Sequence, residues 1–547
     1  MRKLFTLLLF LTVILPYGFA QVKTVTGTVK DSESLIGIPG VTISVRSGQG
    51  VQTDATGRFS IEAAPSDTLT FRFIGYTQQT AVVGSQTTLD IFLVNEDQAL
   101  EEVVVIGYGT ARKRDLTGSI ASIKGEEIAD KPNSNPLASL QGKVAGLQIV
   151  NSGRPGAEPD IRIRGTNSIN GAKPLYVVDG ILNDNMNFVN PADIESMEIL
   201  KDPSSLAIFG VRGANGVIVV TTKSAKAGQV NFNFNTSVGF KKAQDRINLT
   251  DASAFKTLYS EQLANEGNPA YNFENWNANT DWQDEIFQTG VINFNNLSVS
   301  AANEKNKFYL GLGYMIDEGV VKNEKLDKIS LSLNDQLSIT DYLRVGVNLT
   351  GYRSNIPRNN EFYNPIIGSA VRSAPIAPTF NDQYGLYHTL PDFQRAQIRN
   401  PLVSVMELSD KSLQQEYRTT GSLYGEIDFL KNFTFKANIL YDYGFNKGRT
   451  YSPLINVYNP EIAGDDKTDR LTTITSVDQY QNTYSKVQTD WLLTYKNSFG
   501  DHNLTATAGW TSYYRGYEFT TSNGTQGTGD PIPNDPRFWY VNMTSQA

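Results

Sequence analysis

The chain has 547 residues, a net charge of −8 and no cysteine, and its only histidines are His388 and His502. This length predicts more than one domain. The acidic balance argues against a nucleic-acid-binding protein, which needs a basic surface. The absence of cysteine excludes a disulfide framework and cysteine-ligated zinc.

Residues 1–20 have the pattern of a secretory signal peptide. Arg2 and Lys3 form a charged start, Leu4–Leu15 is the apolar core, and the small residues Gly18 and Ala20 predict cleavage between Ala20 and Gln21. A retained anchor is the alternative, but the apolar core is shorter than the roughly 20 residues of a membrane span. We therefore expect an exported protein, which could enter a membrane only as a closed β-barrel.

Residues 21–96 predict a small β-sandwich. Short segments alternate apolar with polar residues and are separated by turn residues such as Pro39-Gly40. The expected strands are Thr24–Val29, Val41–Val45, Gly57–Ile61, Leu69–Phe73 and Leu89–Leu93.

This segment resembles the carboxypeptidase-regulatory-like domain, which implies a seven-stranded sandwich. The resemblance rests on Gly27-Thr28-Val29, Ile38–Val41, Thr53–Phe59 and Gly75-Tyr76. The segment contains no histidine or cysteine, so we expect no zinc site and no peptidase activity despite the family name.

Residues 97–111 contain a short apolar run with polar neighbours. Val103–Ile106 favours an extended strand, and Gly107 and Gly109 then interrupt it. Such a segment can add as a strand to the edge of a partner's sheet. Taken alone, the run is better explained as an ordinary buried strand, and the flanking segments must decide.

Residues 112–224 predict a small mixed α+β unit. Glu126–Ala129 and Pro136–Leu140 have the pattern of short helices. The remaining segments favour strands, and these are Gly146–Val150, Pro159–Gly165, Leu175–Gly180, Ile194–Asp202 and Gly216–Lys223.

This unit resembles the plug domain of TonB-dependent outer-membrane transporters. Five motifs occur in order, namely Ile161–Gly165, Val177–Gly180, Ile194–Lys201, Ser205–Gly210 and Ala214–Ile218. The variant Ala214-Asn215-Gly216 and the segment Gln141–Gly146 resemble the SusC/RagA branch, as does the sandwich that precedes the plug.

The resemblance assigns structural or gating roles to ten plug residues: Arg162, Arg164, Gly165, Asp179, Gly180, Glu195, Glu198, Lys201, Gly210 and Gly216. The charged motif residues could lie on solvated strand faces. Because a plug has no free surface, we favour a buried ion network between plug and barrel wall. Asp179-Gly180 is also an ordinary turn sequence, and the glycines lack the lysine and hydroxyl residue of a phosphate-binding loop.

Residues 225–547 predict barrel strands, because apolar and polar residues alternate strictly. Nine strands are expected, starting near residues 229, 291, 306, 329, 343, 416, 433, 481 and 503. Short turns alternate with long loops, which is typical of outer-membrane barrels and not of a soluble sandwich. A change of phase at Asn295-Asn296 predicts a β-bulge.

The expected fold is therefore mainly β, with a small sandwich, an α+β plug and a partial antiparallel transmembrane β-barrel. Bacterial single-chain barrels have an even number of strands, and plugged transporters have about 22. The chain also stops in a polar segment, residues 542–547. We expect an N-terminal portion of a longer protein or a truncated gene product.

The resemblance implies TonB-dependent import across the bacterial outer membrane, with a SusD-like surface lipoprotein as partner, oligosaccharide or peptide as cargo, and no cofactor. Periplasmic TonB would bind the TonB box, which is Glu101, Glu102, Val103, Val104, Val105, Ile106, Gly107 and Tyr108. The alternative is a signal-transducing receptor for another ligand, such as a metal chelate. No HExxH, GxSxG or Walker pattern favours an enzyme.

Cargo-binding residues are not identified by the sequence. Four aromatic residues in predicted barrel loops could stack on sugars or could equally form loop cores, and these are Trp276, Trp282, Tyr384 and Tyr387.

Overall fold

The structure is a computed structural model. It describes residues 23–32, 35–45, 50–73, 75–94, 103–106, 109–112, 120–129, 133–166, 173–225, 228–356, 366–500, 502–527 and 529–543. The predicted signal peptide with Ala20 and Gln21 lies outside the described residues, as do Glu101, Glu102, Gly107 and Tyr108. The chain divides into two compact units, which we describe separately. No helix in the described part is long and apolar enough to cross a membrane.

The first unit contains a sandwich of seven strands in two sheets. One sheet has the order β4-β1-β7 and the other β3-β2-β5-β6. The five predicted strands are confirmed, while β3 and β6 were missed; both are short edge strands without a fully buried side chain, so their apolar pattern is weak. The strands are β1 (Lys23–Asp31), β2 (Thr42–Val45), β3 (Gly50–Gln52), β4 (Arg58–Ala63), β5 (Thr68–Arg72), β6 (Gln79–Val82) and β7 (Thr88–Leu93).

The inner faces of the two sheets form one apolar core. Phe59 from the first sheet meets Phe71 from the second edge to face, with ring centroids 5.6 Å apart. Gly27 lies where β1 passes between its neighbours, and a Cβ there would meet the carbonyl oxygen of Leu89 at 1.8 Å. The alternation seen in the sequence therefore marks the buried face correctly.

Val103–Ile106 forms β8, which pairs with β9 (Gly109–Arg112) in a sheet of two strands. Within the described residues, neither strand pairs with a third. An isolated two-stranded sheet is only marginally stable in water. The extended conformation predicted for this segment is confirmed, and β8 has one edge without a strand partner among those residues.

The plug is built on a five-stranded sheet of order β10-β15-β16-β13-β14, with a separate pair β11-β12. Short helices fill the connections. Its strands are β10 (Ile120–Lys124), β11 (Leu147–Val150), β12 (Asp160–Ile163), β13 (Leu175–Val178), β14 (Ile181–Asn183), β15 (Ile194–Leu200) and β16 (Val217–Thr222). Its helices are α3 (Gly125–Ala129), η2 (Pro136–Leu140), η3 (Pro191–Asp193), α4 (Pro203–Leu206) and η4 (Ala207–Gly213).

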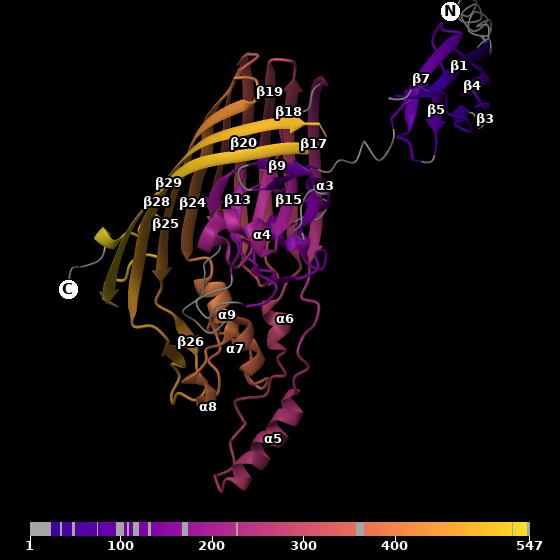
Figure 1. The fold of residues 1–547 in the computed structure, drawn as a ribbon. Coiled ribbons are helices and arrows are strands. Elements are labelled where there is room, and N and C mark those ends of the chain that lie inside the picture. The colour runs from indigo at the N-terminus through magenta and orange to yellow at the C-terminus, as the bar shows by residue number, and fades with distance from the viewer. Residues whose placement is uncertain are drawn as a thin grey trace, which may run out of the picture. The chain divides into compact units, whose positions relative to one another are not determined.

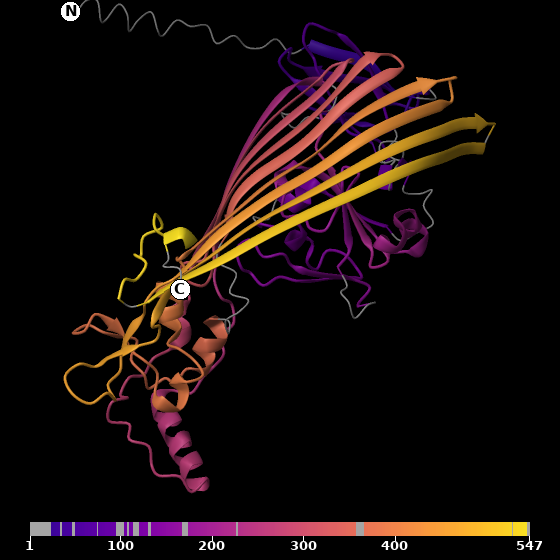
Figure 2. The same cartoon turned by 90° about the vertical axis from the view of Figure 1, so that its left-hand side faces the viewer.

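Nine long strands form one antiparallel sheet in chain order, as predicted. Figures 1 and 2 show this sheet curving along one side of the plug. Within the described residues, the end strands β17 and β29 have a strand neighbour on one side only. The strands are β17 (Gly228–Lys241), β18 (Gly290–Ala302), β19 (Asn306–Glu318), β20 (Lys325–Thr340), β21 (Leu343–Ile356), β24 (Ser412–Phe429), β25 (Phe433–Ser452), β28 (Ile474–Phe499) and β29 (His502–Gly527).

Long connections gather at one end of this sheet and short turns at the other, which confirms the predicted alternation (Figure 1). The long connections fold into small elements of their own. These are α5 (Ala252–Asn265), α6 (Trp282–Ile286), α7 (Ile366–Arg372), β22 (Phe380–Asn381), β23 (Leu386–Tyr387), α8 (Asp392–Arg395), α9 (Pro401–Val403), η5 (Ser404–Leu408), β26 (Asn456–Tyr458), β27 (Thr468–Arg470) and η6 (Val541–Met543).

The bulge predicted at Asn295-Asn296 is wrong, because pairing of β18 with both neighbours is continuous there. The apolar pattern changes phase for another reason. Ile292 and Phe294 point to the inner face and pack with Met315 and Leu326. Gly156 of the plug approaches Leu326, with its ideal Cβ position only 3.4 Å away. Apolar residues thus occupy this part of the inner face, next to Gly156 of the plug.

The sandwich core yields a first prediction. Phe71→Ala should destabilise the sandwich by about 3–5 kcal/mol, because it removes a buried aromatic ring and leaves a cavity. The control is Phe92→Ala, since Phe92 is 43% exposed. The urea midpoint for proteolysis of the sandwich, measured in the full-length protein, should fall for the first variant and change little for the second. Equal midpoints would contradict this packing.

Candidate functional site

The plug contacts the inner face of the sheet mainly through polar side chains. We call this contact the polar seat. Its plug side lies in the segment from β14 to η3, and its wall side is formed by inward-facing residues of the barrel strands. The plug residues are Asn183, Asp184, Asn185, Asn190 and Asp193, and the wall residues are Asn296, Tyr309, Ser332, Arg418, Asp442, Lys486 and Arg515.

Arg418 of β24 is the centre of the seat. Its guanidinium donates two hydrogen bonds of 2.8 Å to the Asp442 carboxylate of β25. It also donates to the side-chain oxygens of Asn185, at 2.9 Å, and Asn183, at 2.7 Å, both in the plug. The same guanidinium lies 4.0 Å from the ring centroid of Phe188. One buried cation therefore joins two barrel strands to the plug.

Two more cations of the wall meet the plug at Asp184. The Lys486 ammonium lies 3.0 Å from the Asp184 carboxylate and 3.6 Å from that of Asp442. Arg515 is 3.6 Å from the Asp184 carboxylate. Partial burial acts to raise the pKa of Asp184, but Lys486 and Arg515 outweigh it and hold this pKa below its usual value. Asp184 is thus a charged anchor of the plug.

Asp193 of η3 forms a second anchor. Tyr309 and Ser332 donate hydrogen bonds of 2.7 Å and 2.6 Å to its two carboxylate oxygens. Burial raises the pKa of the Asp193 carboxyl, although these hydrogen bonds act in the opposite direction. The wall approaches the plug closely at this point, and only glycine fits there, because a Cβ at position 311 would lie 2.5 Å from the Asp193 carboxylate.

Further polar contacts extend the seat along β18 to β20. Asn190 donates a 2.8 Å hydrogen bond to the Asn296 side chain, and Lys328 donates to the carbonyl oxygen of Asn187. A Cβ at Gly313 would lie 2.5 Å from the Asn190 amide. Glycine on the wall therefore provides the space that the plug amide occupies.

The composition of the seat determines how it can separate. A hydrogen bond contributes only about 0.5–1.5 kcal/mol net, because water replaces it when it breaks. An apolar interface of the same area would lose its burial energy without such compensation. The seat also has an apolar part, since Tyr352 of β21 packs in the plug core. A largely polar seat can hold the plug firmly and still let it move into a hydrated channel.

Arg162 and Arg164 differ from the sequence interpretation, because their ion pairs lie within the plug. Arg162 pairs with Asp160 at 2.8 Å, and both side chains are more than two-fifths exposed. Arg164 pairs with Asp202 at 2.6 Å. A plug-to-wall network exists, but these two cations do not contribute to it. Arg164 lies just beyond β12 with a φ of +56°, so the two arginines do not share one strand face.

The other predicted plug residues also have defined positions. Lys201 donates to the carbonyl oxygen of Ala145 at 3.0 Å. Glu198 is buried in the second half of β15, and Glu195 is partly buried near the start of that strand. Their assignment to gating stays a prediction.

Asp179 and Gly180 form the turn between β13 and β14. Thr222 donates to both Asp179 carboxylate oxygens, through its backbone N–H at 2.9 Å and its hydroxyl at 2.8 Å. Burial raises the pKa of Asp179, and the bonds from Thr222 oppose this. Gly180 has a φ of +86°, which favours glycine. This turn fixes the strand that begins the plug side of the seat.

Three predicted glycines have positive φ values, namely Gly165, Gly210 and Gly216. At Gly216 the reason is also steric, because a Cβ would lie 2.6 Å from Cδ1 of Ile163. The turn there lets the chain entering β16 pack against the Ile163 side chain of β12. This position is structural and needs no phosphate.

Trp276 and Trp282 lie in the long loops, and Trp282 also lines a cavity there. Both side chains are buried in the core of the long loops. Their indole N–H groups donate to the Glu461 carboxylate at 3.0 Å and to the Ala374 carbonyl at 2.9 Å. Both residues therefore form part of the loop core, and contact with cargo stays a prediction. No cluster of three or more metal-ligating side chains occurs in the part of the chain that the structure describes.

Sequence comparisons identify two known domains in this chain. Residues 112–217 match the TonB-dependent Receptor Plug Domain, and residues 25–105 match the CarboxypepD_reg-like domain. TonB-dependent receptor P3 of Formosa agariphila is 35% identical over 525 residues, covering 92% of this chain and 49% of that protein. TonB-dependent receptor SusC of Bacteroides thetaiotaomicron is 36% identical over 383 residues, covering 67% of this chain and 37% of that protein.

The chain thus spans about half the length, or less, of the curated relatives it matches. Among solved structures, the RagAB peptide importer in its open-open state superposes with a TM-score of 0.66 and 22% identity. The match covers 82% of this chain and 52% of that chain. The closed-closed state gives a TM-score of 0.64. This likeness supports the plug and barrel fold.

The polar seat yields a second prediction. Arg418→Gln should loosen the plug, because breaking a buried ion pair from one side costs about 3–5 kcal/mol. Hydrogen–deuterium exchange of residues 181–193 should become about tenfold faster or more, since each lost hydrogen bond contributes about 1 kcal/mol.

Arg344→Gln is the matched control, because both carboxylates paired with Arg344, those of Glu426 and Asp428, belong to the barrel strand β24. It should leave exchange in residues 181–193 unchanged. Equal exchange in the two variants would show that Arg418 does not hold the plug.

Proposed function

Because this chain belongs to the family of TonB-dependent receptors, we propose that the protein imports oligosaccharide or peptide across the bacterial outer membrane. Energy enters through periplasmic TonB, and a SusD-like lipoprotein assists at the cell surface. The observation that carries the proposal is the plug, which is seated in a barrel wall by contacts that water can replace.

The TonB box is the segment from Glu101 to Tyr108, directly before the plug. Its described part, β8, is extended and is paired on one side only within the described residues. An extended segment with a free edge can add to a partner's sheet through main-chain hydrogen bonds. The valine-rich composition of Val103–Ile106 favours that conformation.

Force on this segment reaches the plug at β10, which is paired with β15. The strain then acts on the polar seat through Asp193 and Asp184, which flank the Asn185–Asn190 stretch. Release of these anchors opens a hydrated path along the inner wall. The plug residues assigned from the motifs, such as Asp179 and Gly216, keep the plug folded as a unit while it moves.

The long loops supply the outer part of the transport path. Aromatic residues pack in their core, as shown by Tyr259 and Phe393, whose ring centroids are 4.5 Å apart. A packed loop domain offers a defined surface for a lipoprotein partner. The RagAB complex is described as a peptide importer, and this supports peptide as one of the two cargo classes.

A third prediction tests the coupling. Val104→Pro should abolish energised uptake, because proline has no backbone N–H and cannot donate in a strand ladder. Val104→Thr is the control, since it keeps that N–H and a high preference for strands. Uptake is measured in cells that carry the full-length gene, with oligosaccharides, peptides and a metal chelate supplied in turn.

Uptake that is equal in Val104→Pro and wild type would sink the coupling proposal. The compound whose uptake is lost in Val104→Pro but kept in Val104→Thr identifies the class of cargo. If only the metal chelate shows this dependence, the receptor alternative replaces nutrient import.

A further inference from the structure

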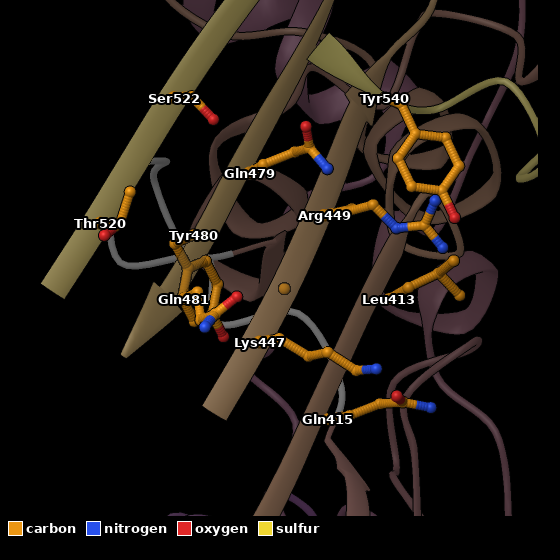
Figure 3. Close-up of a pocket in the computed structure, with 11 residues that line it drawn as sticks. Leu413, Gln415, Lys447, Arg449, Gln479, Tyr480, Gln481, Thr520, Ser522 and Tyr540 are labelled. Atoms are coloured by element: carbon orange, nitrogen blue, oxygen red, sulfur yellow. The ribbon is translucent and has the colours of Figure 1, made fainter. Parts of the chain in front are cut away.

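A cavity of about 440 Å³ lies on the sheet near the end that carries the long loops. Figure 3 shows the side chains that line it, which come from four neighbouring strands, β24, β25, β28 and β29, with Tyr540 beside Arg449. We call it the outer-wall site. Its principal polar residues are Gln415, Lys447, Arg449, Gln479 and Gln481.

The pairing register places this site on the face of the sheet opposite the plug. Asp442 faces inward, because it pairs with Arg418 in the polar seat. Side chains alternate between faces along a strand, so Tyr443, Lys447 and Arg449 face outward. Lys447 is paired with Gln415 on one side and Gln481 on the other, so these amides share the outward face.

The outward face of β25 also shows the depth of the site. Large apolar or aromatic side chains recur from Phe433 to Tyr443. Ten residues of strand span about 34 Å, or about 26 Å along the membrane normal at the usual tilt, which matches the apolar band of a barrel. Lys447 and Arg449 follow immediately beyond Phe445 on the same face. They therefore lie at the level of lipid headgroups.

Cations predominate at this level. Lys447 and Arg353 both face outward, and each lies 5.9 Å from the ring of Tyr417 between them. No aspartate or glutamate is among the described residues that line the cavity. The outward carboxylates of Asp327 and Glu518 belong to β20 and β29, at the borders of this cationic region.

The site has a fixed rim. Arg449 donates to the carbonyl oxygens of Pro536 and Trp539, and its guanidinium lies 4.1 Å from the ring centroid of Tyr540. Trp539 stacks on Tyr451 with ring centroids 5.1 Å apart. The segment before η6 is thus held against the outside of the wall and closes one side of the cavity.

We propose that the outer-wall site binds the phosphate group of an anionic lipid headgroup in the leaflet that faces the long loops. Lys447 in the cavity and Arg353 beside it, across the Tyr417 ring, supply the charge. The glutamine amides and the hydroxyls of Thr520 and Ser522 bind neutral polar groups of the headgroup. Only a lipid is presented to this face at this depth, because the face is continuous with the apolar band. The inference rests on the proposed membrane location.

The test is native mass spectrometry of the full-length protein in neutral detergent. Diphosphoryl lipid A, monophosphoryl lipid A, phosphatidylcholine and inorganic phosphate are titrated separately. We expect affinity to rise with the net negative charge of the lipid, in the order phosphatidylcholine, monophosphoryl lipid A, diphosphoryl lipid A, with no retained inorganic phosphate. The double variant Arg353→Gln/Lys447→Gln should bind diphosphoryl lipid A at least about tenfold more weakly than wild type, because two charge-assisted contacts are lost.

The control is Lys305→Gln, which removes an exposed charge in a short turn at the opposite end of the sheet. It should bind as wild type does. Equal affinity of the double variant and the control, or of lipids with and without net charge, would overturn the proposal. Retention of inorganic phosphate as strongly as lipid A would mean a free-anion site instead. This assay needs no TonB, so it is independent of the uptake test.

Discussion

The guanidinium of Arg418 has to be satisfied from two sides at once, and the arrangement of plug and wall depends on this requirement. The Asp442 carboxylate neutralises its charge within the wall, while the amide oxygens of Asn183 and Asn185 complete its hydrogen bonds from the plug. A buried cation without partners would be very costly. Removing the plug therefore requires water to take its place, and a hydrated channel can supply that water.

Neighbouring contacts follow the same principle. Asp184 faces two wall cations, and Asp193 receives two hydroxyl donors. Glycines at 311 and 313 let the plug approach the wall closely enough for these short bonds. In contrast, the N-terminal sandwich is held by an apolar core that includes Phe59 and Phe71. The sandwich is thus held by apolar packing, whereas the contact between plug and wall is largely polar, as the proposed release of the plug requires.

Much of the fold could be predicted because its information is local. Strict alternation located all nine barrel strands, and five ordered motifs located the plug. An ion network between plug and wall was predicted, but its residues were not, since Arg418, Asp442 and Lys486 look like ordinary polar strand residues until the fold brings Arg418 to Asn183 and Lys486 to Asp184. The apolar inner face at Ile292 and Phe294 was misread as a bulge for the same reason. Arg162 and Arg164 were predicted to pair with the wall because they belong to a plug motif, yet their ion-pair partners, Asp160 and Asp202, lie within the plug.

The central claim is that the plug is released from an intact wall by force applied ahead of β10. Optical-tweezers pulling on residues 109–112 of the full-length protein in a lipid nanodisc tests it most directly. The account predicts that the plug extends before any barrel strand does, and that Arg418→Gln lowers the release force while Arg344→Gln does not. Barrel strands that detach first, or a release force unaffected by Arg418→Gln, would contradict it.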